Sequence, residues 1–234
     1  MAVEFKPDII LTIFSWPISN SLLASFLSLG LIFLTLFIFK KRLKEAPGRF
    51  QAAIEIIYEG FFDFYNDILE SSKQTKVFFS FLFAFFLYVI VSNWIGLLPG
   101  IGSLVVHLGG QTVPLFRSTY SDLNMTLALA LISVIGVNII AIFYLRRFYF
   151  KKWLTALAPF EIFSEFAKII SFSFRLFGNI FAGDVLLIVI FSLSGYILPV
   201  PFIGLEIFVG FIQALIFTAL TAIFLKVALI QTSH

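Results

Sequence analysis

One arginine stands inside a long apolar part of the sequence, and its chemistry raises the first question about function. Arg175 lies in the stretch SFSFRLFGNIFAGD, residues 171–184, inside a run that is otherwise almost wholly apolar from Ile169 onward. A guanidinium does not lose its proton in a protein, and placing one mid-helix in a bilayer costs about 3 kcal/mol. Arg175 is therefore expected to face protein, water or an opposite charge.

Polar residues accompany Arg175 at helical spacing. At about 100° per residue, a group of them falls within about 40° of Arg175, namely Glu161, Ser164, Lys168, Ser171 and Asn179. Asp184 falls on the opposite face, and in the next apolar segment Glu206 and Gln213 share a face. Two polar faces with a fixed cation between them suit an ion path that water reaches from both sides without a continuous pore.

Other interpretations of these residues remain open from the sequence. Arg175 could instead form an internal ion pair that only fixes packing, and the acids available for it are Glu161, Glu165, Asp184 and Glu206. Asn179 and Gln213 also suit ordinary hydrogen bonds between membrane helices. Charged residues near the start of the Arg175 segment could be merely solvated. Asn138 is expected to be a packing amide, and Asn93 suits either role.

The composition predicts a membrane protein. The 234 residues are 60% hydrophobic and 12% charged, whereas a soluble domain is nearer a quarter charged. The net charge of +3 is small, and its basic residues lie mostly between apolar runs, which indicates membrane topology and no nucleic-acid binding. Cysteine is absent, and His107 and His234 fall in an expected loop and in the tail. We therefore expect no disulfide, no metal site and no cofactor.

The segments that must position Arg175 follow from apolar runs of membrane-spanning length. Five membrane helices are expected, at residues 18–39, 77–98, 122–145, 159–193 and 202–230. The last two exceed about 25 residues and should form a long tilted hairpin. Residues 48–72 predict an amphipathic helix on the cytoplasmic surface, whose acidic row Glu55, Glu59, Asp63 and Asp67 either is solvated or contacts a partner subunit. The expected fold is all-α and polytopic, a single membrane domain over residues 1–234.

Local signals predict several boundaries and the topology. Pro17 suits the first turn of the first helix, Asp122 suits the N-cap of the third spanning helix, and residues 101–121 are expected to form an irregular loop. Basic clusters at residues 40–44 and 146–152 are expected in the cytoplasm. That places the N-terminus outside and the C-terminus in the cytoplasm.

Four blocks of the sequence resemble one family in the same order. FRLFGN at 174–179, followed by AGD at 182–184, closely resembles the signature of subunit a of F-type ATP synthases. NWIGLLPG at 93–100, SDLNMT at 121–126 and IQALIF at 212–217 are similar to that family's other blocks. The RLFGN block within a membrane helix is the most specific of these signals, and the resemblance covers nearly the whole chain.

The resemblance implies a stator subunit that grips a rotating ring of c subunits. Further implied partners are peripheral-stalk b subunits, membrane lipid and the transported proton, and no catalytic activity is expected of this subunit alone. Arg175 matches the family's essential arginine, and Asn179 and Gln213 match its polar neighbours. Asp184 and Glu206 match positions on the ion path open to the outside. The matches on the inner path are Ser171, Glu161 and Lys168.

Two departures from the family's pattern concern the outer path. The family often has a glutamate where Asp184 stands and a histidine where Glu206 stands. If these two acids lie close together, we expect them to titrate as a coupled pair. The sequence leaves open a sodium-coupled version of the subunit, a self-contained ion channel or carrier, and a membrane scaffold. A bacterial plasma membrane is expected, with a plastid thylakoid membrane as the alternative.

Overall fold

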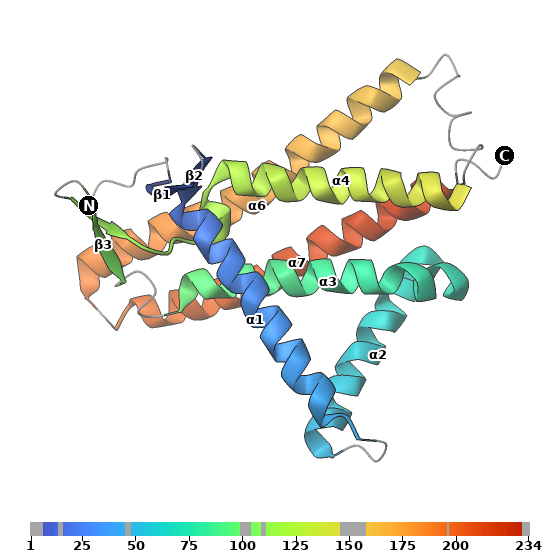
Figure 1. Cartoon of the computed structure of the whole chain (residues 1–234), viewed down its shortest axis with the longest axis horizontal. Coiled ribbons are helices and arrows are strands. Elements are labelled where there is room, and N and C mark those ends of the chain that lie inside the picture. The colour runs from blue at the N-terminus through green and yellow to red at the C-terminus, as the bar shows by residue number, and fades with distance from the viewer. Residues whose placement is uncertain are drawn as a thin grey trace.

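The protein is built almost entirely from long helices. The computed structural model describes residues 7–13, 16–44, 48–98, 104–108, 111–145, 158–195 and 197–230. Its helices, labelled in Figure 1, are α1 (Asn20–Arg42), α2 (Arg49–Leu69), α3 (Ser72–Leu97), α4 (Leu123–Leu145), α6 (Ala158–Ser194) and α7 (Pro199–Ile230). Five of them, all but α2, are long and apolar enough to cross a membrane. The expected all-α polytopic fold is therefore confirmed.

The start of α1 differs from the prediction. Pro17 does not open the helix, because it lies in strand β2 (Trp16–Ser19), opposite Thr12 of strand β1 (Ile9–Ile13). The helix begins after Ser19, whose Oγ accepts a hydrogen bond from the Leu22 N–H at 3.2 Å. A serine cap satisfies an otherwise unpaired backbone donor, and this local signal outweighs the proline as a helix start.

The segment before α4 is more regular than expected. Strands β3 (Val105–Leu108) and β4 (Gln111–Pro114) form an antiparallel hairpin, and a 3-10 helix, η2 (Thr119–Ser121), follows. The expectation of an irregular loop was therefore wrong for these residues. Asp122 does precede α4, and its Oδ1 accepts from the Asn124 N–H at 2.9 Å. Its Oδ2 accepts from Ser21 Oγ at 2.7 Å, which ties α4 to the start of α1.

Two further helix boundaries fall earlier than expected. The surface helix α2 ends at Leu69, because Glu70 takes a left-handed conformation (φ 51°) and its N–H donates to the Asn66 carbonyl. The next helix then starts at Ser72. Helix α7 starts at Pro199, since a proline is accommodated in the first turn of a helix. The basic residues at 146–152 and His234 lie outside the described residues.

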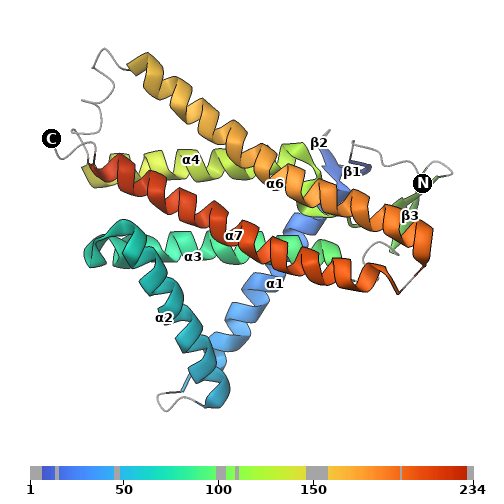
Figure 2. The same ribbon diagram turned by 180° about the vertical axis from the view of Figure 1, so that it is seen from behind.

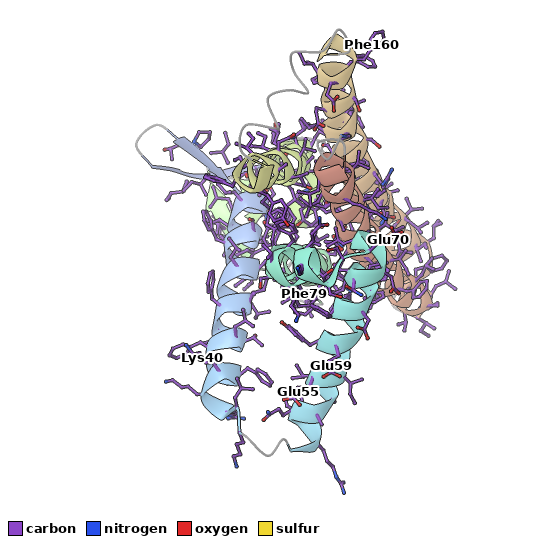
Figure 3. The ribbon with its side chains drawn as sticks, turned by 90° about the vertical axis from the view of Figure 1, so that its right-hand side faces the viewer. Lys40, Glu55, Glu59, Glu70, Phe79 and Phe160 are labelled. Atoms are coloured by element: carbon purple, nitrogen blue, oxygen red, sulfur yellow. The ribbon has the colours of Figure 1, made fainter. Side chains whose placement is uncertain are left out.

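The helices form two layers with two arms. In Figures 1 and 2, α3 and α4 run side by side, and α6 and α7 cross them on one face. Helix α7 packs against α3, and α6 packs against α4. Helix α1 crosses α3 on the other face, and Figure 3 shows α1 and α2 leaving the bundle on the same side. Phe79, labelled between these arms, is buried and packs edge-on against Tyr58 of α2.

Hydroxyl side chains join the layers. The pairs are Ser25–Tyr88 at 2.7 Å, Tyr65–Thr218 at 2.9 Å, Thr126–Ser173 at 2.9 Å and Ser133–Thr221 at 2.9 Å. Burial raises the pKa of Tyr65 to about 12, so its hydroxyl stays neutral and can donate. Lys226 Nζ also lies 2.9 Å from Glu70 Oε1, which fixes the end of α2 to α7. These contacts give the long α6–α7 hairpin a fixed position on the α3–α4 layer.

Candidate ion-path site

Arg175 lies on an exposed stripe of α6. Its Nη2 donates to Ser171 Oγ one turn earlier at 3.4 Å, and both side chains are exposed. Within the described ranges, no carboxylate lies within 4 Å of the guanidinium. The alternative of an internal ion pair with one of this chain's acids therefore finds no support in the geometry. Among the described residues, the side-chain hydrogen-bond partner of Arg175 is thus the neutral hydroxyl of Ser171.

Small residues surround Arg175 on this stripe. Ala167, Gly178 and Ala182 are exposed on the same side of α6, and a Cβ added at Gly178 would meet no other atom of the chain within 4 Å. Small residues let a neighbouring membrane helix approach the backbone closely. The stripe can therefore bring Arg175 within reach of a group on another subunit.

A first cavity lies before Arg175 along α6. It has a volume of about 210 Å³ and lies between α4, α6 and α7. Its polar lining residues are Asn138, Glu161, Ser164, Glu165 and Lys168, and we call it the Lys168 cavity. Lys168 Nζ is 2.7 Å from Glu165 Oε1, and the other oxygen of that carboxylate accepts from Asn138 Nδ2 at 3.1 Å. One charged pair of this cavity is thus already neutralised.

A second cavity lies beyond Arg175 along α6. Its volume is about 190 Å³, and it lies between α3, the segment before η2, α6 and α7. Its polar lining residues are Asn93, Ser118, Asn179, Asp184 and Glu206, and we call it the Asp184 cavity. Asn93 Nδ2 donates to the Gly210 carbonyl at 2.9 Å, which holds the wall formed by α3 against α7. Two acids line each cavity, but only the Lys168 cavity also has a lysine among its described lining residues.

The two acids of the Asp184 cavity interact with each other electrostatically. Arg117 and Ser121, which precede α4, also interact with Asp184. The Glu206 carboxylate occupies the space that a side chain at Gly183 would need, because an added Cβ there would coincide with its Oε1. A glycine beside Asp184 therefore lets an acid from the next helix lie directly against α6.

The predicted site residues fall into four places. Glu161 and Lys168 share the first cavity, and Asn179, Asp184 and Glu206 share the second. Arg175 and Ser171 line neither cavity and lie on the exposed stripe between them. Gln213 also lines neither cavity. It is buried in α7, and its Nε2 has no hydrogen-bond partner in the part of the chain that is described.

Sequence reasoning missed several lining residues. Asn138 was expected to be a packing amide, yet it lines the Lys168 cavity and binds Glu165. Ser118 and Gly183 were not recognised as part of the site at all. The sequence signalled Gly183 only as a member of the AGD block, and it gave no comparable signal for Asn138 or Ser118, since their roles depend on which helices pack together.

A match to a protein family covers the part of the chain that carries the predicted site residues. The family model described as "ATP synthase A chain" matches residues 22–226, which contain Arg175 and every polar residue that lines the two cavities. The chain belongs to this family.

Bacterial family members named "ATP synthase subunit a" align with most of the chain. The protein of Desulfotalea psychrophila is 37% identical over 190 residues, covering 78% of this chain and 72% of that protein. The protein of Syntrophobacter fumaroxidans is 32% identical over 202 residues, covering 83% and 77% respectively. The protein of Geotalea daltonii is 27% identical over 216 residues, covering 89% and 86%. The resemblance seen in the sequence is confirmed, and the chain is a membrane-sector component of an ATP synthase, not a catalytic subunit.

Proposed function

We propose that this chain is the stator subunit that couples proton movement to rotation of a ring of c subunits in an ATP synthase. The observation that carries the proposal is the placement of Arg175. It is exposed and lacks a carboxylate partner among the described residues, and it lies on α6 between the residues that line two cavities. A permanent cation on a membrane helix costs free energy unless a partner neutralises it. A carboxylate on a passing c subunit is such a partner.

The two cavities supply the two ends of a discontinuous proton route. A proton from outside enters the Asp184 cavity, where Asp184 and Glu206 accept and pass it on to a c-subunit carboxylate. The neutralised carboxyl can then turn into lipid, because it no longer carries a charge. After nearly a full rotation it passes Ser171 on the exposed stripe, and its proton leaves through the Lys168 cavity, where Glu161 and water accept it.

Arg175 separates the two ends of the route. It attracts the ionised carboxylate, and it cannot relay a proton directly, since a guanidinium does not deprotonate in a protein. A proton can therefore cross only by riding on the ring. The membrane potential contributes about 2.3 kcal/mol per charge per 100 mV, and the rotation transmits this free energy.

The direction of the route follows from the basic end of α1. Lys40, Lys41 and Arg42 occupy its last turn, and such clusters remain in the cytoplasm. The helix that follows, α2, is joined to α7 by the Glu70–Lys226 ion pair, and Ala228, two residues on, lines the Lys168 cavity. The Lys168 cavity therefore opens to the cytoplasm and the Asp184 cavity to the outside. The N-terminus lies outside and the C-terminus in the cytoplasm.

The partners follow from the proposed mechanism. The exposed stripe around Arg175 faces the ring of c subunits, and peripheral-stalk b subunits hold this chain still against rotation. The proposed location is a bacterial plasma membrane, in keeping with the bacterial relatives. A sodium-coupled version remains the alternative, because the ring supplies the carboxylate that binds the ion.

Two variants of Arg175 test the proposal in the assembled complex. Arg175→Ala should leave the c ring co-purifying with this chain while ATP-driven proton pumping into vesicles stops. Arg175→Lys should also fail, because an ammonium covered by the ring can lose its proton, whereas a guanidinium cannot. Normal pumping by either variant would overturn the proposal. A self-contained channel predicts instead that the purified chain transports ions without a ring, and a scaffold predicts that assembly and pumping are lost together.

A further inference from the structure

Helix α6 carries two cationic residues on nearly the same face. Lys168 and Arg175 are seven residues apart in the sequence. On an ideal helix that spacing places them about 20° apart in direction and about 10 Å apart in height. A passing ring carboxylate would be attracted by both cations if both were free. Only Arg175 is suited to hold it between the two cavities, so the second cation is a potential competitor.

Contacts from three helices neutralise Lys168 and turn it into its cavity. Its Nζ lies 2.7 Å from Glu165 Oε1 on α6 and 4.7 Å from the centre of the Phe224 ring on α7. Asn138 on α4 donates to Glu165 Oε2 at 3.1 Å and to the Val134 carbonyl at 2.8 Å. Both members of the ion pair are largely enclosed, with 22% and 18% of their side-chain surface exposed.

The contacts of Lys168 also set the direction in which its side chain is held. Glu165 lies about 80° around the helix from Arg175, on the side that faces α4. The Lys168 ammonium, which is ion-paired with Glu165, is therefore drawn away from the exposed stripe. Arg175, by contrast, keeps an exposed side chain whose hydrogen bond goes to the neutral hydroxyl of Ser171.

We propose that Glu165 is a positioning residue that neutralises Lys168 and holds it in the Lys168 cavity, so that Arg175 alone attracts the ring carboxylate. The inference rests on the proposed function and gives Glu165 a role other than carrying the proton. Asn138 fixes the second carboxylate oxygen, which leaves Glu165 in one orientation. The competing explanation is that Glu165 itself accepts the released proton.

A charge swap distinguishes the two explanations. The variants Glu165→Gln, Glu165→Lys and the double variant Glu165→Lys/Lys168→Glu are built into the complete complex and reconstituted in vesicles. ATP-driven proton pumping is measured per assembled complex, using the amount of c ring that co-purifies. Glu165→Gln should slow pumping about tenfold, the size expected of one uncompensated charge about 10 Å away at an effective dielectric of about 20. Glu165→Lys should slow it further, and the swap should recover most of the loss.

The outcomes separate the inference from the proposed function. Pumping at the wild-type rate in Glu165→Gln, or no recovery in the swap variant, would overturn the role of Glu165. Arg175→Ala, tested in the same vesicles, decides the proposed function independently of these results. If the swap variant fails to assemble, Asn138→Leu decides, because it loses one contact to Glu165 without changing any charge. A smaller slowing in the same direction supports the inference, and unchanged pumping overturns it.

Discussion

The two cavities of this protein are alike in size and differ in how their charges are arranged. The Lys168 cavity, of about 210 Å³, is lined by the ion pair of Lys168 with Glu165 and by a second acid, Glu161. The Asp184 cavity, of about 190 Å³, is lined by two carboxyl groups, and none of its described lining residues is cationic. Paired acids can hold and exchange a proton, whereas a lysine–glutamate pair is already neutral without one. Under the proposed function, the arrangement of charges, and not the cavity volume, would separate proton entry from proton exit.

The largest expected effect comes from removing both acids of the Asp184 cavity, which abolishes the difference between the two cavities. The double variant Asp184→Asn/Glu206→Gln should lower ATP-driven proton pumping by at least about 100-fold, since positioned acid–base groups typically contribute that much or more. Each single variant should have a smaller effect, because the remaining acid still accepts a proton. The measurement is the initial pumping rate in inverted vesicles with matched amounts of complex. If the double variant pumps like wild type, the Asp184 cavity is not the entry route.

A larger side chain at Gly183 tests whether Glu206 must keep its position in the Asp184 cavity. Gly183→Val should slow pumping several-fold, because a side chain there takes the space of the Glu206 carboxylate and must displace it. Gly204→Ala is the matched control, since an added Cβ at Gly204 meets nothing within 4 Å. Equal pumping rates in the two variants would show that the position of Glu206 does not matter.

A change on the stripe between the cavities tests the contact with the ring. Gly178→Leu places a large side chain beside Arg175 in space that is open within this chain. We expect a modest reduction in the amount of c ring that co-purifies, with unchanged thermal stability of the isolated chain. Gly30→Leu, at another open position on α1, should leave the ring bound. Full ring binding by Gly178→Leu would mean that this stripe faces lipid.

The smallest expected effect concerns the packing of α2 against α7. Tyr65→Phe removes the hydrogen bond to Thr218 but keeps the aromatic ring. We expect a loss of about 0.6 kcal/mol in the free energy of unfolding, the average for such bonds between membrane helices. Thr218 keeps its bond to the Ala214 carbonyl at 3.0 Å, which limits the loss. Unfolding in detergent measures the change, and a loss of several kcal/mol would show that α2 has a larger structural role.

The sequence predicted the spanning helices because a bilayer imposes strong rules on length and polarity. Local signals predicted the ends of the helices less well. The Ser19 cap and the β1–β2 pairing, and not Pro17, decided where α1 starts. Helical spacing placed Asn179 with Arg175 and put Asp184 on the opposite face of α6, yet Asn179 and Asp184 line the same cavity. The resemblance to a family supplied their proposed roles.

The sequence alone did not predict which residues line each cavity. Asn138 enters the Lys168 cavity because α4 packs on α6, and Gly183 matters because Glu206 arrives from α7. Helical spacing describes one helix at a time and does not give the pairing of two. The absence of an ion pair to Arg175 from the described part of the chain likewise depends on how the helices pack.

The separation of the two cavities is tested most directly by thiol labelling from each side of the membrane. The native chain has no cysteine, so single variants give an unambiguous signal. Ser164 lines the Lys168 cavity, and Val209 lines the Asp184 cavity. A membrane-impermeant thiol reagent should label Ser164→Cys only from the cytoplasmic side and Val209→Cys only from the outside. Labelling of both variants from the same side, or of neither from any side, would contradict two separate inlets divided by Arg175.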